Sequence, residues 1–172
     1  MRRIQRMPSR IAWGIAGLFL LAALCGGPSE GLAFGLSGVG GKLGVVDPDG
    51  ADGTFAFGMN LEFEEAGSRF HLQPGFLYWN TNGLEDVNPN FDALYHFEPA
   101  GRLSPYLGAG VGLHVYSLDG PGADPGTDVG ANLFGGVVFP AGSARIFAEG
   151  RYMATDLSQF GILGGVTFPF HE

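Results

Sequence analysis

The stretches TFAFGMNLEFE at residues 54–64 and LSPYLGAGVGLHVY at residues 103–116 alternate between two kinds of side chain. In the first, every second residue is large and apolar, and the residues between are small or polar. The second repeats the pattern, with Leu107 and Val111 on its aliphatic face. Strict alternation at a period of two indicates β-strands with two different faces.

Six further stretches alternate in the same way. They lie at residues 36–45, 69–78, 91–97, 129–139, 145–155 and 160–170. With the first two they make eight segments, close to the ~9–11 residues that a tilted transmembrane strand requires. The 31 glycines among 172 residues disfavour helices. The sequence therefore predicts an all-β chain, an eight-stranded antiparallel up-and-down transmembrane β-barrel.

The apolar face of these strands is expected to contact lipid. The opposite face is too poor in Lys and Glu to be the exterior of a soluble barrel, and a closed sheet satisfies its own backbone polar groups. A soluble periplasmic lipocalin-like binding barrel, with the apolar face turned inward, is the alternative. The residues expected to face lipid are Phe55, Phe57, Leu107, Val111, Leu113, Val166 and Phe168.

The predicted connections differ in length on the two sides. Those at residues 65–68, 98–103 and 140–143 are short, and those at 46–53, 79–90 and 117–128 are longer and acidic. The eighth strand follows a short connection at residues 156–159. Short periplasmic turns and longer external loops are typical of outer-membrane barrels, so the acidic side is expected to face the cell exterior.

Residues 1–33 have the layout of a signal peptide. Four arginines precede an uncharged apolar run at residues 11–24, and small residues at Gly31 and Ala33 fit signal-peptidase cleavage after Ala33. The apolar run is shorter than the ~20 residues of a membrane-spanning helix. Cys25 hints at a lipoprotein, but Leu24 is too large for a lipobox. The predicted organisation is a cleaved signal peptide at 1–33 and a barrel domain at 34–172.

Cleavage would change both the chemistry and the charge of the chain. It removes the only cysteine, and with it disulfide and thiolate chemistry. It also removes four arginines and one glutamate, so the net charge falls from −8 to −11. A chain this acidic lacks the basic surface that binds nucleic acid.

Three motifs resemble the small outer-membrane β-barrels of the OmpA-like and OmpX-like kind. PYLGAGVG at residues 105–112 resembles the fifth strand of that family, and FAEGRY at 147–152 resembles its penultimate strand. GVTFPF at 165–170 resembles the terminal aromatic signal that the barrel-assembly machinery reads, although two residues follow it here. The resemblance implies an outer-membrane barrel with Phe168 and Phe170 as its assembly signal, and it specifies no activity.

Charged residues on the second face are predicted to form a polar network in the lumen. An eight-stranded barrel has an interior just wide enough for side chains to fill, and charges held there must pair. A gated narrow ion path is the alternative. The predicted network consists of Lys42, Glu62, Glu64, Asp92, Arg145, Glu149 and Arg151.

Other polar residues suggest weaker candidates. Asp47, Asp49 and Asp52 resemble part of a calcium loop without its bidentate glutamate, and a solvated turn is the simpler interpretation. The histidines His71, His96 and His114, which the alternation places inward on different strands, suggest a metal cluster or a catalytic base. None of them has a serine in the His-x-Ser arrangement expected of a barrel lipid A deacylase, so neither catalysis nor a cofactor is predicted. The inward rings of Tyr106, Tyr116 and Phe134 are expected to pack against inward glycines.

The sequence thus predicts a non-enzymatic protein of the cell outer membrane with a structural or surface-interaction role, in envelope integrity or adhesion. Four alternatives stay open: the soluble periplasmic lipocalin-like barrel, a narrow channel for small or hydrophobic solutes, a gated ion path, and a lipid-A-modifying barrel enzyme. The expected partners are outer-membrane lipids, lipopolysaccharide and the barrel-assembly machinery.

Overall fold

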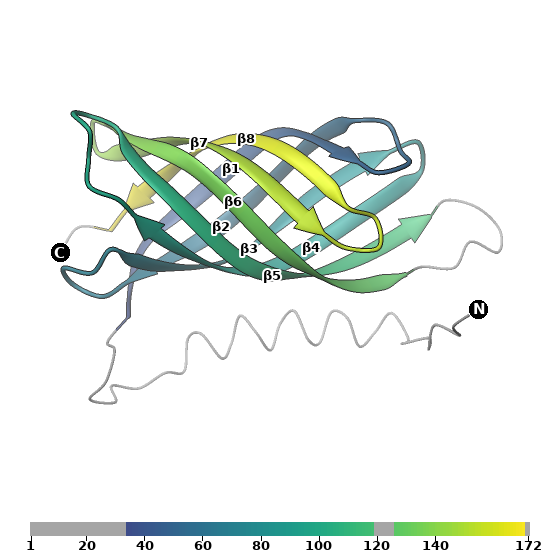
Figure 1. Ribbon diagram of the computed structural model, residues 1–172, viewed down its shortest axis with the longest axis horizontal. Helices are drawn as coiled ribbons and strands as arrows, with labels where there is room; N and C mark the ends of the chain where they lie inside the picture. The colour runs from purple at the N-terminus through teal and green to yellow at the C-terminus, as the bar shows by residue number, and fades with distance from the viewer. Residues whose placement is uncertain (1–33, 119–125, 171–172) are drawn as a thin grey trace. The chain divides into compact units, whose positions relative to one another are not determined.

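A computed structural model describes residues 34–118 and 126–170, and these residues form eight β-strands. The strands are β1 (Gly35–Pro48), β2 (Thr54–Glu64), β3 (Phe70–Thr81), β4 (Leu84–His96), β5 (Ser104–Leu118), β6 (Thr127–Ala141), β7 (Ala144–Ala154) and β8 (Gln159–Pro169). Each strand pairs antiparallel with the next, and β1 pairs with β8, so the sheet closes into a barrel (Figure 1). The predicted all-β, eight-stranded fold is confirmed. The signal peptide predicted at residues 1–33 lies outside the described residues.

The two faces of the sheet differ as the alternation predicted. In β2, Phe55 is 80% exposed, whereas the next residue, Ala56, is 3% exposed. The same alternation continues around the barrel, and large apolar side chains lie exposed on the outside of all eight strands. The barrel is therefore apolar on the outside of its strands and holds buried polar and charged side chains inside. The described residues contain no helix of the length and apolarity that a membrane span requires.

The two ends of the barrel are called here the terminal rim and the distal rim. The terminal rim holds the start of β1, the end of β8 and the connections at residues 65–69, 97–103 and 142–143. The distal rim holds the connections at the opposite ends of the strands, of which residues 119–125 are not described. The predicted short connections of the terminal rim are confirmed.

The prediction of a long loop at residues 79–90 is wrong. β3 and β4 continue through this stretch and pair up to Thr81 and Leu84, so only Asn82 and Gly83 form the turn. Both have positive φ, 47° and 79°, as a two-residue hairpin turn of type I′ requires. β4 consequently begins at Leu84 rather than at residue 91, and its first half carries polar residues toward the interior.

The loop predicted at residues 46–53 is also shorter than expected. β1 continues to Pro48, so this connection comprises residues 49–53 only. The loop predicted at 117–128 loses residues to β5 and β6 at its two ends, and its centre lies outside the described residues. The predicted contrast in loop length is therefore absent among the fully described connections, because polar residues assigned to the distal loops extend the strands instead.

Inward aromatic rings lie over glycines on the neighbouring strand. Phe134 pairs directly with Gly108, and a Cβ at that glycine would overlap its ring. Tyr106 pairs with Gly136 in the same way, and Phe147 covers Gly165. Glycines thus make room for rings that fill the lumen, as predicted for Tyr106 and Phe134.

We expect Gly108→Ala to destabilise the barrel by about 1–3 kcal/mol, the usual cost of overpacking. The new Cβ would overlap the ring of Phe134 and lie 2.8 Å from the backbone oxygen of Ala93. Urea unfolding in detergent, followed by the fluorescence of Trp79, measures the loss. Gly41→Ala is the matched control, since nothing lies within 4 Å of a Cβ there. Equal stability of the two variants would contradict this account of the packing.

Candidate functional site

The lumen is filled by side chains, in two apolar clusters with polar networks around them. Toward the distal rim, Trp79, Leu77 and Met153 form the centre of one cluster, together with Val46, Ala56 and Leu163. In the other half of the barrel, Leu94, Tyr106, Phe134 and Phe147 form the second. Trp79 and Leu77 are at most 2% exposed, so the first cluster closes the interior on the distal side.

Arg151 is the centre of the polar network in the middle of the barrel. Its guanidinium forms ion pairs of 2.8 Å with both Glu149 and Asp92, and it lies 4.1 Å from the centroid of the Phe134 ring. The Tyr106 hydroxyl donates a hydrogen bond of 2.9 Å to the second carboxylate oxygen of Glu149. Asn132 donates one of 3.0 Å to Asp92. One buried guanidinium thus pairs with two buried carboxylates.

A second network lies nearer the distal rim and includes two residues that the sequence analysis missed. His114 Nδ1 lies 2.7 Å from Asp86 Oδ2, and both side chains are fully buried. Gln159 donates to the same carboxylate oxygen over 3.1 Å and accepts a bond of 2.9 Å from the Trp79 indole. Asp86 was missed because the stretch 79–90, in which it lies, was assigned to a loop. Once β4 is extended back to the Asn82–Gly83 turn, the period-two alternation places Asp86 on the inward face.

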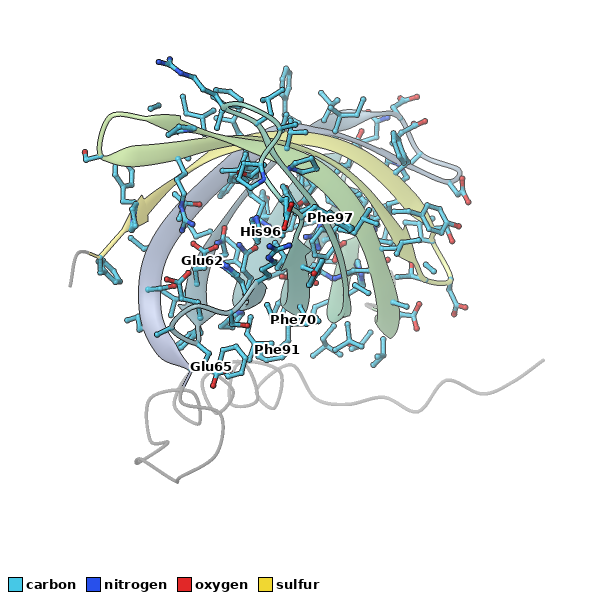
Figure 2. The ribbon with its side chains drawn as sticks, turned by 60° about the vertical axis from the view of Figure 1, so that its left-hand side comes forward. Glu62, Glu65, Phe70, Phe91, His96 and Phe97 are labelled. Atoms are coloured by element: carbon cyan, nitrogen blue, oxygen red, sulfur yellow. The ribbon has the colours of Figure 1, made fainter. Side chains whose placement is uncertain are left out.

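A third group of polar side chains lies at the terminal rim, where Glu62, His71 and His96 project inward from three consecutive strands. Figure 2 shows Glu62 and His96 within the barrel and Phe70 on its outside. His71 Nδ1 lies 3.0 Å from Glu62 Oε1, and the rings of His71 and His96 are 4.4 Å apart between centroids. Arg145 pairs with the other oxygen, Glu62 Oε2. The structure thus brings two of the three candidate histidines together and leaves His114 with Asp86.

A small cavity adjoins this cluster. Its volume is about 20 Å³, and Glu62, His96 and Arg145 are among the residues that line it. A cavity of this size holds about one water molecule. The cluster also has access to solvent, since the side chain of Glu64, 3.4 Å from His71 Nδ1, is 40% exposed.

The remaining residue of the predicted lumen network, Lys42, projects inward from β1 and is 5% exposed. All seven residues of that network therefore face the interior, although Glu64 and Arg145 are only partly buried. Six of the seven form two groups: Arg151, Glu149 and Asp92 in the middle, and Glu62, Glu64 and Arg145 at the terminal rim.

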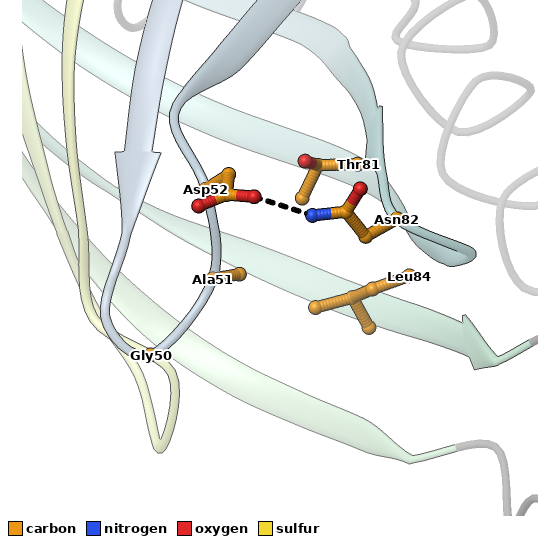
Figure 3. Close-up of a pocket in the computed structure, with 6 residues that line it drawn as sticks. All are labelled: Gly50, Ala51, Asp52, Thr81, Asn82 and Leu84. Atoms are coloured by element: carbon orange, nitrogen blue, oxygen red, sulfur yellow. Dashed lines mark hydrogen bonds between the residues drawn. The ribbon is translucent and has the colours of Figure 1, made fainter.

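The candidate aspartates of the distal rim do not converge. Asp52 accepts a hydrogen bond of 2.6 Å from Asn82, which links the β1–β2 connection to the β3–β4 turn beside an open pocket of about 390 Å³ (Figure 3). Within the described part of the chain, the group of three residues that meets the spacing of metal ligands is Glu62, His71 and His96.

The two rims differ in charge. Within residues 34–118 and 126–170, the connections of the distal rim and the adjacent strand ends carry carboxylates without Lys or Arg. The terminal rim carries both signs: Arg69 donates a hydrogen bond of 2.8 Å to Glu98 between neighbouring connections. That hydrogen bond holds the pKa of the exposed Glu98 carboxyl below its usual value and raises the pKa of Arg69.

No protein-family model and no curated protein matches this sequence. Solved structures do match it in fold. A crystal structure of Neisserial surface protein A covers 82% of this chain and 100% of its own, with a TM-score of 0.64 at 16% identity. A structure of the Yersinia pestis outer membrane protein Ail in a phospholipid bilayer nanodisc covers 78% of this chain and 99% of its own, with a TM-score of 0.51 at 13% identity.

This chain has the fold of the small eight-stranded outer-membrane β-barrels. At these identities the likeness concerns the outer-membrane barrel fold and not a particular role. The outer membrane enzyme PagL also matches, with a TM-score of 0.49 at 13% identity, over 74% of this chain and 97% of its own.

The residues that the sequence analysis expects to contact lipid lie on the outer face of the barrel. Phe55, Phe57, Leu107, Val111 and Phe168 are between 52% and 80% exposed, and Leu113 and Val166 are partly exposed. Phe168 and Phe170 of the expected assembly signal are both about half exposed, at 52% and 49%, at the terminal rim.

Proposed function

We propose that this chain spans the cell outer membrane as a closed, non-enzymatic barrel with a structural or surface-interaction role. The observation that carries the proposal is the apolar outer face, exposed on every strand, around an interior that holds buried ion pairs. In water such an exterior would aggregate, whereas in a bilayer it contacts the apolar acyl chains of the lipids. The outer-membrane location would require export, for which residues 1–33 are the expected signal peptide.

A soluble lipocalin-like barrel is not supported, because it would turn its apolar face inward and its charges outward. Here Phe55 is 80% exposed while Arg151, Asp92 and Glu149 are at most 4% exposed. The arrangement is the reverse of that of a soluble barrel.

A channel function, for solutes or ions, is disfavoured by the filled lumen. Side chains of both apolar clusters and of the Arg151 network occupy the interior between the rims. Moving them would expose buried charges and open the aromatic–glycine pairs. We therefore propose a barrel that conducts neither ions nor small solutes.

A lipid-A-modifying activity requires a nucleophile and a base at an accessible position. The His114–Asp86 pair has the geometry of a base with its orienting carboxylate, but both side chains are 0% exposed. Among the described residues no serine hydroxyl is hydrogen-bonded to a histidine. The pair is better explained as a structural network that joins β4, β5 and β8.

The surface-interaction role is assigned to the distal rim. Both ends of the barrel chain lie at the terminal rim, which in a barrel with an even number of strands faces the periplasm. The distal rim would then face the cell exterior and present carboxylates such as Asp49, Asp52 and Asp156. Such a surface favours cationic partners, and lipopolysaccharide phosphates would need bridging divalent cations.

Labelling of single cysteines tests this orientation. We expect Ala51→Cys at the distal rim to react with a membrane-impermeant maleimide on intact cells. Ala66→Cys, in the β2–β3 connection of the terminal rim, should react only after the outer membrane is permeabilised. The two variants control for one another, because both replace an alanine in a connection. Labelling of Ala66→Cys alone on intact cells would reverse the orientation, and equal labelling of both would contradict a membrane-spanning barrel.

A further inference from the structure

We propose that Glu62, His71 and His96 form a binding site for a divalent transition-metal ion of the zinc type at the terminal rim. Each of the three residues offers one ligand atom, and these atoms all lie within 4.8 Å of one another. Two imidazole nitrogens and a carboxylate oxygen are a donor set that suits zinc and its first-row neighbours, whereas calcium and magnesium prefer oxygen alone.

The backbone geometry explains why these three residues meet. β2, β3 and β4 are consecutive and hydrogen-bonded, and His71 pairs with Glu64 on one side and Leu94 on the other. Glu62 and His96 each lie two residues away from those partners along their strands, on the same inward face. A site built on three adjacent strands of a closed barrel is held more precisely than one on loops.

The present contacts indicate how an ion would enter. Glu62 Oε1 and His71 Nδ1 lie 3.0 Å apart at hydrogen-bond distance, and a bound ion would take the place of the proton between them. Ligands of a four-coordinate zinc at ~2.0–2.1 Å lie about 3.4 Å apart, so this pair is close to the required spacing. Since the ligand atoms lie within 4.8 Å of one another, the ring of His96 has to approach by at most about 1.4 Å to complete the site.

An unpartnered nitrogen provides independent support. His96 Nε2 is inaccessible to solvent and has no hydrogen-bond partner among the described residues. A buried polar atom without a partner is costly, and in native proteins it calls for a water, an ion or a functional role. The adjoining cavity of about 20 Å³ is lined by the same Glu62 and His96 and has room for one water as a further ligand.

Neighbouring charges would tune the affinity. Arg145 pairs with Glu62 Oε2 and so leaves Oε1 available, but its positive charge opposes a second cation nearby. Glu64, 3.4 Å from His71 Nδ1, offsets part of that repulsion and is placed to become a fourth ligand. Because the side chain of Glu64 is 40% exposed, the site opens toward the terminal rim.

Calorimetric titration of zinc sulfate into the untagged, detergent-solubilised full chain tests the site, after treatment with a chelator. We expect one zinc ion per chain. His71→Gln and His96→Gln should each weaken binding by at least about 10–100-fold, which is the effect of losing even an outer partner of a metal ligand. His114→Gln is the matched control and should bind as the unaltered chain does, since His114 is paired with Asp86 elsewhere.

His96→Gln is the decisive variant, because the Nε2 atom that it replaces makes no hydrogen bond within the described residues. Thermal unfolding gives a second readout: saturating zinc should raise the unfolding temperature of the unaltered chain and of His114→Gln, but not that of His96→Gln. The proposal is overturned if the unaltered chain takes up no zinc, or if His96→Gln binds zinc undiminished.

Discussion

Replacement of Arg151 by alanine is expected to destabilise the barrel by about 3–5 kcal/mol, the range for breaking a buried ion pair from one side. Arg151 is 2% exposed and is paired with both Glu149 and Asp92, which are themselves 4% and 0% exposed. Without the guanidinium, the hydrogen bonds left to the two carboxylates within the described part of the chain come from Tyr106 and Asn132. The contact of the guanidinium with the Phe134 ring is lost as well.

Urea unfolding in lipid vesicles, compared with the unaltered chain, measures this loss. Arg69→Ala is the control, because it also breaks an arginine–carboxylate pair, that with Glu98, but on the surface. Exposed pairs are worth about 0–1 kcal/mol. If the two variants lost equal stability, the middle of the lumen would be hydrated and the Arg151 network would not be the buried pairing described above.

Val111→Arg is expected to cost about 2–4 kcal/mol, the range for a cation on the lipid face at the bilayer midplane. Val111 lies at the centre of β5, and its side chain is 56% exposed on the outer surface. Water would accommodate an arginine there at almost no cost, whereas lipid would not. The same unfolding experiment in vesicles measures the difference.

Two controls isolate the effect of the charge from that of size. Val111→Leu keeps the position apolar and should change stability little, since no neighbour encloses an outward side chain. Ser117→Arg places the same cation near the distal end of β5, at an exposed position where the penalty should approach zero. A near-zero cost for Val111→Arg would contradict the contact between the outer face and lipid.

The period-two pattern of the sequence was enough to predict the fold, because each strand has one apolar and one small or polar face. It predicted residues 54–64 at the bounds that β2 has. It failed where polar residues continue a strand beyond its apolar part, as in the first half of β4. The pair Asn82–Gly83 was the available signal, since its positive φ angles make it a hairpin turn between two regular strands.

The lumen was predictable in its composition but not in its pairing. Alternation alone indicated that Arg151, Glu149 and Asp92 face inward. The register between neighbouring strands decides which inward residues lie at the same height along the barrel axis. The sequence carries no readable pattern that gives this register. For this reason the neighbourhood of His71 and His96, and the separation of both from His114, emerged only from the register of β3, β4 and β5.

Heat-modifiability in the outer-membrane fraction tests the central claim, a closed barrel embedded in the outer membrane, most directly. The chain is extracted from isolated outer membranes and run on a detergent gel with and without boiling. We expect it in that fraction, with a mobility that shifts on boiling, because a closed hydrogen-bonded barrel resists detergent until it is heated. A chain found free in the periplasm, with the same mobility before and after boiling, would contradict the account.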